Sequence, residues 1–103
     1  MKITIEKDFT DTPGGRNKEQ SEYSGEEFRE RILIPKFNEC LKNNEKLVVD
    51  LDNTYGYPTS FLDEAFGKLV KEFTDEQLKN IEYISKDEPN LIIDIKKYME
   101  NNR

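Results

Sequence analysis

The sequence predicts an α/β domain in which three to four helices pack on a mixed β-sheet of about four strands. Residues 46–51 carry aliphatic side chains in near-continuous order, which is typical of a buried strand. Apolar residues recur at helical spacing over residues 25–42, 59–73 and 88–101. The length of 103 residues suits a single domain, which we expect to span residues 1–103.

The expected strands are read from the apolar pattern. Ile3 and Ile5 alternate with polar residues and indicate a short strand toward an edge of the sheet. Residues 46–51 should form the central strand, covered on both faces, and residues 81–84 the next one, reached by a right-handed crossover. A brief further strand around Gln20 to Tyr23 would bring the sheet to four.

The expected helices have start signals in the sequence. Ser24 and Glu27 have the spacing of a capping box at the start of helix 25–42, which Pro35 should kink. A second capping box at Thr74 and Gln77 should open a short helix that ends at Asn80. The helix over 59–73 places Phe66 on its apolar stripe and leaves Asp63 and Glu64 on a solvated surface.

Composition excludes several functional classes. The chain has 22 acidic and 16 basic residues and a net charge of −6, which disfavours binding to nucleic acid. It has no His, the commonest metal ligand and general base, and its only cysteine, Cys40, lies on an apolar stripe as a small buried side chain. Without a stretch long enough to span a membrane, and with no signal peptide, we expect a soluble, cytoplasmic protein.

The most informative candidate site is the turn between strand 46–51 and helix 59–73. In open α/β sheets ligands bind beyond the carboxyl ends of strands, and this turn lies at such an end. Tyr55 and Tyr57 flank Gly56 in a polar setting that no core pattern requires, and exposed tyrosines are common in recognition surfaces. The residues that we expect to contact a partner or ligand here are Asp52, Asn53, Tyr55, Gly56, Tyr57 and Thr59.

Asp50 and Asp52 share one face of the strand end and have oxygen ligands that suit a divalent ion. Such a pair more often marks a solvated strand end. No further ligands accompany it, so we predict no metal site and no cofactor.

The same turn resembles the STAS domain of anti-sigma-factor antagonists. Those domains have Asp-Leu followed, after seven residues, by Ser-Ser-Gly-Leu, and a partner kinase phosphorylates the second serine. Aligning Asp50-Leu51 with the first pair places Ser60 on that serine, with Thr59 as the alternate acceptor. Pro58, Thr59 and Phe61 depart from the pattern. The resemblance implies a phosphoserine at a helix N-terminus, where the helix dipole favours negative charge; the alternative is that Thr59 or Ser60 only caps the helix.

A second candidate is Pro13-Gly-Gly-Arg16, because the glycines allow close approach and Arg16 can grip a carboxylate or phosphate. The alternative is that Arg16 is a solvated turn residue. Together with residues 23–29 and Pro35, this motif resembles the STAS-like family of unknown function (DUF4325). The resemblance covers roughly residues 1–73.

Two functional classes follow. The first is a non-enzymatic regulatory module that binds a protein, by resemblance an anti-sigma-type kinase or another ATPase, through the 52–60 turn. The second is a sensor of a small anionic ligand or nucleotide, held by Arg16 and the residues Thr59 and Ser60. An enzyme that uses Ser60 or Asp52 ranks last, since no base–nucleophile pair is visible.

Overall fold

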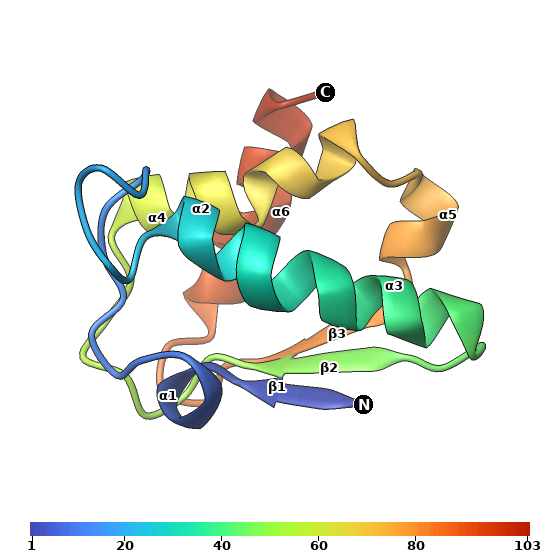
Figure 1. Ribbon diagram of the computed structural model, residues 1–103, viewed down its shortest axis with the longest axis horizontal. Helices are drawn as coiled ribbons and strands as arrows, with labels where there is room; N and C mark the ends of the chain where they lie inside the picture. The colour runs from blue at the N-terminus through green and yellow to red at the C-terminus, as the bar shows by residue number, and fades with distance from the viewer.

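The computed structural model describes residues 1–103 and has two layers, a parallel sheet and a layer of helices (Figure 1). The sheet has three strands in the order β1, β2, β3, so the strand predicted to be central is central. Ile3, Val49 and Tyr83 lie side by side across it. The strands are β1 (Lys2–Thr4), β2 (Leu47–Asp50) and β3 (Ile81–Ile84).

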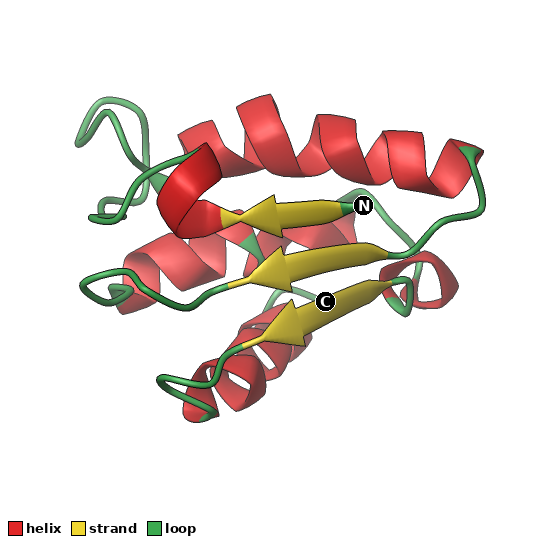
Figure 2. Cartoon of the chain, turned by 90° about the horizontal axis from the view of Figure 1, so that it is seen from below, coloured by secondary structure: helices red, strands yellow, loops and turns green.

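The first helical segment lies at the end of β1, and the others lie on one side of this sheet (Figures 1 and 2). Their bounds are α1 (Ile5–Asp8), α2 (Gly25–Phe28), η1 (Arg29–Leu33), α3 (Ile34–Lys42), α4 (Thr59–Ala65), η2 (Gly67–Lys71), α5 (Asp75–Leu78) and α6 (Asn90–Asn101). None of them is long and apolar enough to cross a membrane.

Only one face of the sheet is covered. Leu47 and Val49 are fully buried beneath the helices, whereas Val48 and Asp50 are only half-buried. The expectation that β2 is covered on both faces is therefore wrong. Parallel strands added in one direction through crossovers of the same hand place every crossover helix on the same face, so nothing in this chain covers the other.

The prediction of four strands in a mixed sheet is also not met. Residues Gln20 to Tyr23 form a turn, and the surrounding loop hydrogen-bonds to itself rather than to the sheet. The amide of Gly14 donates to the carbonyl of Tyr23 at 3.1 Å, and the amide of Gly25 donates to the carbonyl of Gly15 at 2.9 Å. The amide of Gln20 likewise donates within the loop, to the carbonyl of Asn17 at 2.9 Å, so both ends of the expected strand bond locally.

The predicted helix 25–42 forms as one continuous run with a π-helical middle section, η1. Ser24 caps its start by accepting from the amide of Glu27 at 3.1 Å. Just before Pro35, the amide of Ile34 donates to the carbonyl of Arg29, five residues back. A π-helical turn shifts the bonding pattern where proline supplies no donor, so the irregularity expected at Pro35 lies in the turn preceding it.

The predicted helix 59–73 is interrupted at Phe66, where α4 gives way to the 3₁₀ segment η2. A Cβ on Gly67 would lie 2.8 Å from the side chains of Asn102 and Asp63, so this glycine allows α6 to pass closely. The capping box at Thr74 and Gln77 is confirmed with both of its hydrogen bonds, at 2.9 and 3.2 Å.

The core lies between the helices and the covered face of the sheet. Phe28, Phe61 and Phe66 are fully buried, and the ring of Phe28 lies 6.1 Å from that of Phe61 and 5.8 Å from that of Phe66. Cys40 is fully buried as predicted, and burial raises the pKa of its thiol. The apolar stripes of the sequence therefore identify the core face of each long helix.

Candidate functional site

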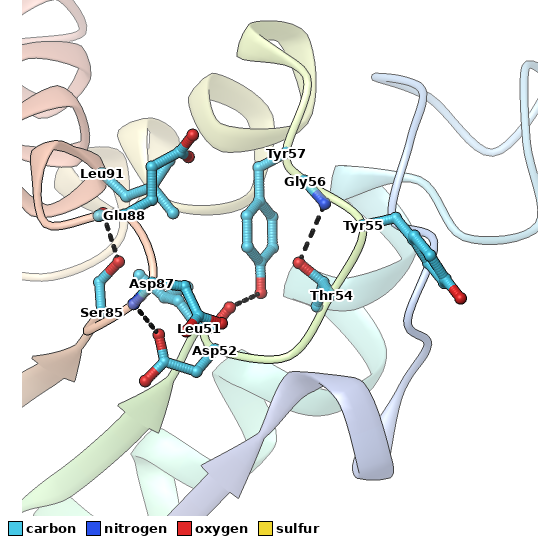
Figure 3. A pocket seen from close by; sticks show the side chains of 10 residues that line it. All are labelled: Leu51, Asp52, Thr54, Tyr55, Gly56, Tyr57, Ser85, Asp87, Glu88 and Leu91. Atoms are coloured by element: carbon cyan, nitrogen blue, oxygen red, sulfur yellow. Dashed lines mark hydrogen bonds between the residues drawn. The ribbon is translucent and has the colours of Figure 1, made fainter.

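A polar hollow of about 180 Å³ lies beyond the carboxyl ends of β2 and β3 (Figure 3). Its walls are the β2–α4 turn on one side and the β3–α6 turn on the other. Four residues predicted from the sequence line it: Asp52, Tyr55, Gly56 and Tyr57. The others are Leu51, Thr54, Ser85, Asp87, Glu88 and Leu91.

Asp52 joins the two turns. It is only 8% exposed, and its Oδ1 accepts hydrogen bonds from the amides of Lys86 at 2.8 Å and Asp87 at 2.9 Å. In return, Asp87 Oδ2 accepts from the amide of Asn53 at 2.9 Å. Asn53 itself has a positive φ of 70°, which asparagine tolerates better than most residues. These bonds hold the start of the β2–α4 turn against the β3–α6 turn.

Tyr57 forms the inner wall of the hollow. Its hydroxyl donates to the carbonyl of Leu51 at 2.8 Å, and its ring lies 5.8 Å from that of Phe61 (Figure 3). Burial raises the pKa of the Tyr57 phenol, so the group stays protonated at neutral pH. Tyr57 therefore anchors the turn to the core and is not poised as a base.

Tyr55 is the opposite case. Its side chain points away from the hollow into solvent, with 86% of the residue exposed (Figure 3). Its amide nevertheless donates to the carbonyl of Asp11 at 2.8 Å, and the next amide, that of Gly56, donates to Thr54 Oγ1 at 3.3 Å. Gly56 has a φ of 122°, a conformation that favours glycine. A backbone held by hydrogen bonds thus presents a largely exposed aromatic side chain.

Arg16 and Thr59 lie together, but in a separate hollow of about 270 Å³ at the end of α6. Arg16 Nη1 is 2.7 Å from Asp63 Oδ2 and 3.6 Å from Glu64 Oε1. Asp63 Oδ1 accepts from the side-chain amide of Asn102 at 2.7 Å. The charge of Arg16 is therefore already matched by two carboxylates, and the residue is not merely a solvated turn residue.

Thr59 and Ser60 are the first two residues of α4, and Ser60 is half-buried. Neither side chain caps the helix. The carbonyl of Pro58 instead accepts from the amides of Phe61 at 3.1 Å and Leu62 at 3.2 Å. The capping interpretation of the two hydroxyls is thus wrong.

A buried ion pair joins α4 to the first long helix, and no sequence pattern indicates it. Glu64, expected on a solvated surface, is 3% exposed, and its Oε2 lies 2.8 Å from Nη1 of Arg29, which also donates to the Glu64 carbonyl oxygen. Lys68 Nζ lies 3.1 Å from the other carboxylate oxygen. Burial alone would raise the pKa of Glu64, but the hydrogen bond from Arg29 and the positive charges of Arg29 and Lys68 outweigh it and lower that pKa. Only the i,i+4 spacing of Glu64 and Lys68 was visible in the sequence.

The two aspartates at the end of β2 both already have hydrogen-bond partners within the protein. Asp50 Oδ1 accepts from the amide of Asp52 at 3.0 Å, and its Oδ2 lies 3.6 Å from the ammonium of Lys2. No group of three or more His, Cys, Asp or Glu side chains is placed to hold a metal ion.

Comparison with known proteins identifies a family. No curated protein and no solved structure matches the chain. The family described as a STAS-like domain of unknown function (DUF4325) matches residues 24–91, from the cap of α2 to the first turn of α6. The match includes β2, the 52–60 turn, α4 and β3, and leaves out β1 and Arg16. Because the family match covers more than half of the residues of the chain, the chain belongs to the STAS-like domain family of unknown function (DUF4325).

Proposed function

We propose that this domain is a non-enzymatic regulatory module that binds a protein partner through the β2–α4 turn, residues 52–60. The observation that carries the proposal is the 86% exposure of Tyr55 on a backbone fixed by hydrogen bonds. Tyrosine offers a large contact area with few rotatable bonds, and a turn ordered in advance loses little entropy on binding. By family resemblance, an anti-sigma-type kinase or another ATPase is the partner to test first.

The proposed switch in this module is phosphorylation of Ser60, with Thr59 as the alternate acceptor. Because neither hydroxyl is used as a cap, a phosphate there would displace no helix-capping bond. It would add about −1.5 to −2 charges close to Asp63 and Glu64, and it would compete with Asp63 for Arg16. The switch would therefore act on the charge that the partner meets where the turn enters α4.

The charges of the site weigh against the rival function, an anionic-ligand or nucleotide sensor. Arg16 is paired with Asp63, and the hollow below Tyr57 is lined by Asp52, Asp87 and Glu88. A phosphate would meet carboxylates in either place. A nucleotide at a hundred times its dissociation constant would raise the free energy of unfolding by about 2.7 kcal/mol, and we expect no such increase in urea denaturation.

The decisive experiment captures partners from the native host by cross-linking and quantitative mass spectrometry, with three baits. Tyr55→Ala should lose at least one of the proteins that the parent captures. Ile93→Ala, which removes another exposed apolar side chain, 65% exposed on α6, should retain them. Capture that is equal with all three baits contradicts the role of the turn.

The purified partner then tests the switch. Ser60→Asp should change its affinity by more than it changes the stability of the domain, whereas Ser60→Ala should bind like the parent. If both variants bind like the parent, the phosphorylation switch is abandoned, while the test of Tyr55 stands unaffected.

A further inference from the structure

The two edges of the sheet, β1 and β3, differ in how they are protected from pairing with another strand. At the β1 edge, the outward amide of Thr4 donates to Asp8 Oδ2 at 2.7 Å, and the chain turns at once into α1. This edge has no free donor at Thr4 and is only three residues long. Short, blocked edges are how proteins prevent pairing with other strands.

The β3 edge has no such protection. The amides of Leu47 and Leu51 donate to the carbonyls of Asn80 and Ile84, so the even-numbered residues of β3 bond to β2. The amides and carbonyls of Ile81 and Tyr83 consequently point away from the sheet. No strand lies beyond them (Figure 2).

A groove of about 750 Å³ runs along this free edge, between α5 and α6. Its apolar lining comes from all three elements: Leu78 of α5, Ile81 and Tyr83 of β3, and Ile92 and Met99 of α6. The phenol oxygen of Tyr83 is buried and has no hydrogen-bond partner, an uncommon condition for a native structure.

Three cationic side chains line the groove, Lys79, Lys96 and Arg103, together with two acidic ones, Asp75 and Glu82. Lys79 is paired with Glu76, and Arg103 is paired with Asp75 and Glu100. Lys96 is exposed and takes part in none of the ion pairs of the molecule. An occupant with an acidic residue would supply the partner that Lys96 lacks.

We propose that the β3 edge binds an extended segment of a partner protein, which adds a fourth strand beside Ile81 and Tyr83. The segment has apolar side chains at alternate positions, facing α6, and an acidic side chain that meets Lys96. The main-chain bonds would provide affinity and the groove would select the side chains, as in other cases of strand addition. This site is separate from the β2–α4 turn and does not depend on its function.

The test uses random peptides displayed on phage and selected on the wild-type domain. Enriched peptides should alternate apolar and polar residues and contain Asp or Glu. A synthetic copy of the best peptide should bind Lys96→Glu about tenfold or more weakly, because reversing the charge places like charges together. Lys97→Glu is the matched control, since Lys97 is exposed on the same helix but does not line the groove, and it should bind like the wild type.

Two further measurements distinguish strand addition from simple adhesion. At saturation the amide of Tyr83 should become protected from hydrogen exchange, and methylating the peptide amides that face β3 should abolish binding. Tyr55→Ala should bind the peptide unchanged, which separates this site from the turn.

Four results would overturn the proposal. They are the absence of enrichment, equal binding to Lys96→Glu and the wild type, an unprotected Tyr83 amide at saturation, and concentration-dependent dimerisation that protects Tyr83 without peptide. The last result would assign the edge to a second copy of the chain.

Discussion

Phe66, at the junction of α4 and η2, packs against both α2 and β3. Its side chain is fully buried, and its ring lies 5.8 Å from that of Phe28 and 5.6 Å from that of Tyr83. Removing the ring would leave a cavity between three elements, and these elements cannot all move in to fill it.

We therefore expect Phe66→Ala to lower the free energy of unfolding by about 3–5 kcal/mol, the usual effect of truncating a buried phenylalanine. Urea denaturation followed by circular dichroism measures the change. Ile93→Ala, at an exposed position, should stay within about 0.5 kcal/mol of the parent. A loss below about 1 kcal/mol for Phe66→Ala would show that the surrounding core is not closely packed.

Between elements, the closest approach that the sequence hides is the crossing of α2 and α4. A Cβ built on Gly25 would lie 2.7 Å from the carbonyl oxygen of Phe61 and 2.9 Å from Cβ of Glu64. The first of these contacts is with backbone, which cannot rotate aside. Gly25 thus sets the distance at which Arg29 reaches Glu64.

Gly25→Ala should lower the free energy of unfolding by about 1–3 kcal/mol, the range for overpacking, even though alanine favours helices. Gly14→Ala is the matched control, because its Cβ would meet only one atom, on Pro58, at 4.0 Å. Thermal unfolding of the two variants compares them directly. Equal melting temperatures for the two variants would mean that α2 and α4 move apart without a measurable loss of stability.

How far the sequence predicts each element depends on the range of the interactions that define it. The α6 helix and the Thr74 capping box rest on side chains three or four residues apart, and both are confirmed. The break at Phe66 depends on the approach of α6 to Gly67, which no local pattern records. The strand expected around Gln20 failed because that loop bonds to itself.

In the candidate site, too, the features that depend on neighbouring residues were predicted and those that depend on distant residues were not. The turn at the end of β2 and the exposed Tyr55 followed from a buried strand running into a polar segment. The role of Asp52 did not, because it accepts bonds from amides 34 and 35 residues further along. The pairing of Arg16 with Asp63 spans 47 residues and was equally invisible.

For the molecule as a whole, a cluster of opposite charges joins the N-terminal loop, the first helix and α4. Arg16 pairs with Asp63, and Arg29 and Lys68 pair with Glu64. Burial would raise the pKa of each carboxyl, but the hydrogen bonds that they accept and the neighbouring cations lower both below their usual values. This cluster makes the stability of the fold dependent on pH.

The sign of that dependence follows from linkage. A carboxyl whose pKa is lower in the folded state stabilises the fold fully above its unfolded pKa, near 4.5 for Glu64, and that contribution is lost as the pH falls through the folded pKa. The free energy of unfolding should therefore fall when the pH is lowered from neutrality to about 4 and below. Urea denaturation at a series of pH values measures the profile.

Glu64→Gln identifies how much of the profile belongs to the buried pair. At neutral pH it should lower the free energy of unfolding by up to about 3–5 kcal/mol, because Arg29 loses its charge partner in the interior. Since glutamine does not titrate, the variant should lose less of its remaining stability on acidification than the wild type does. If the two profiles fall in parallel, the acid sensitivity arises from exposed carboxylates and not from the contact between Arg29 and Glu64.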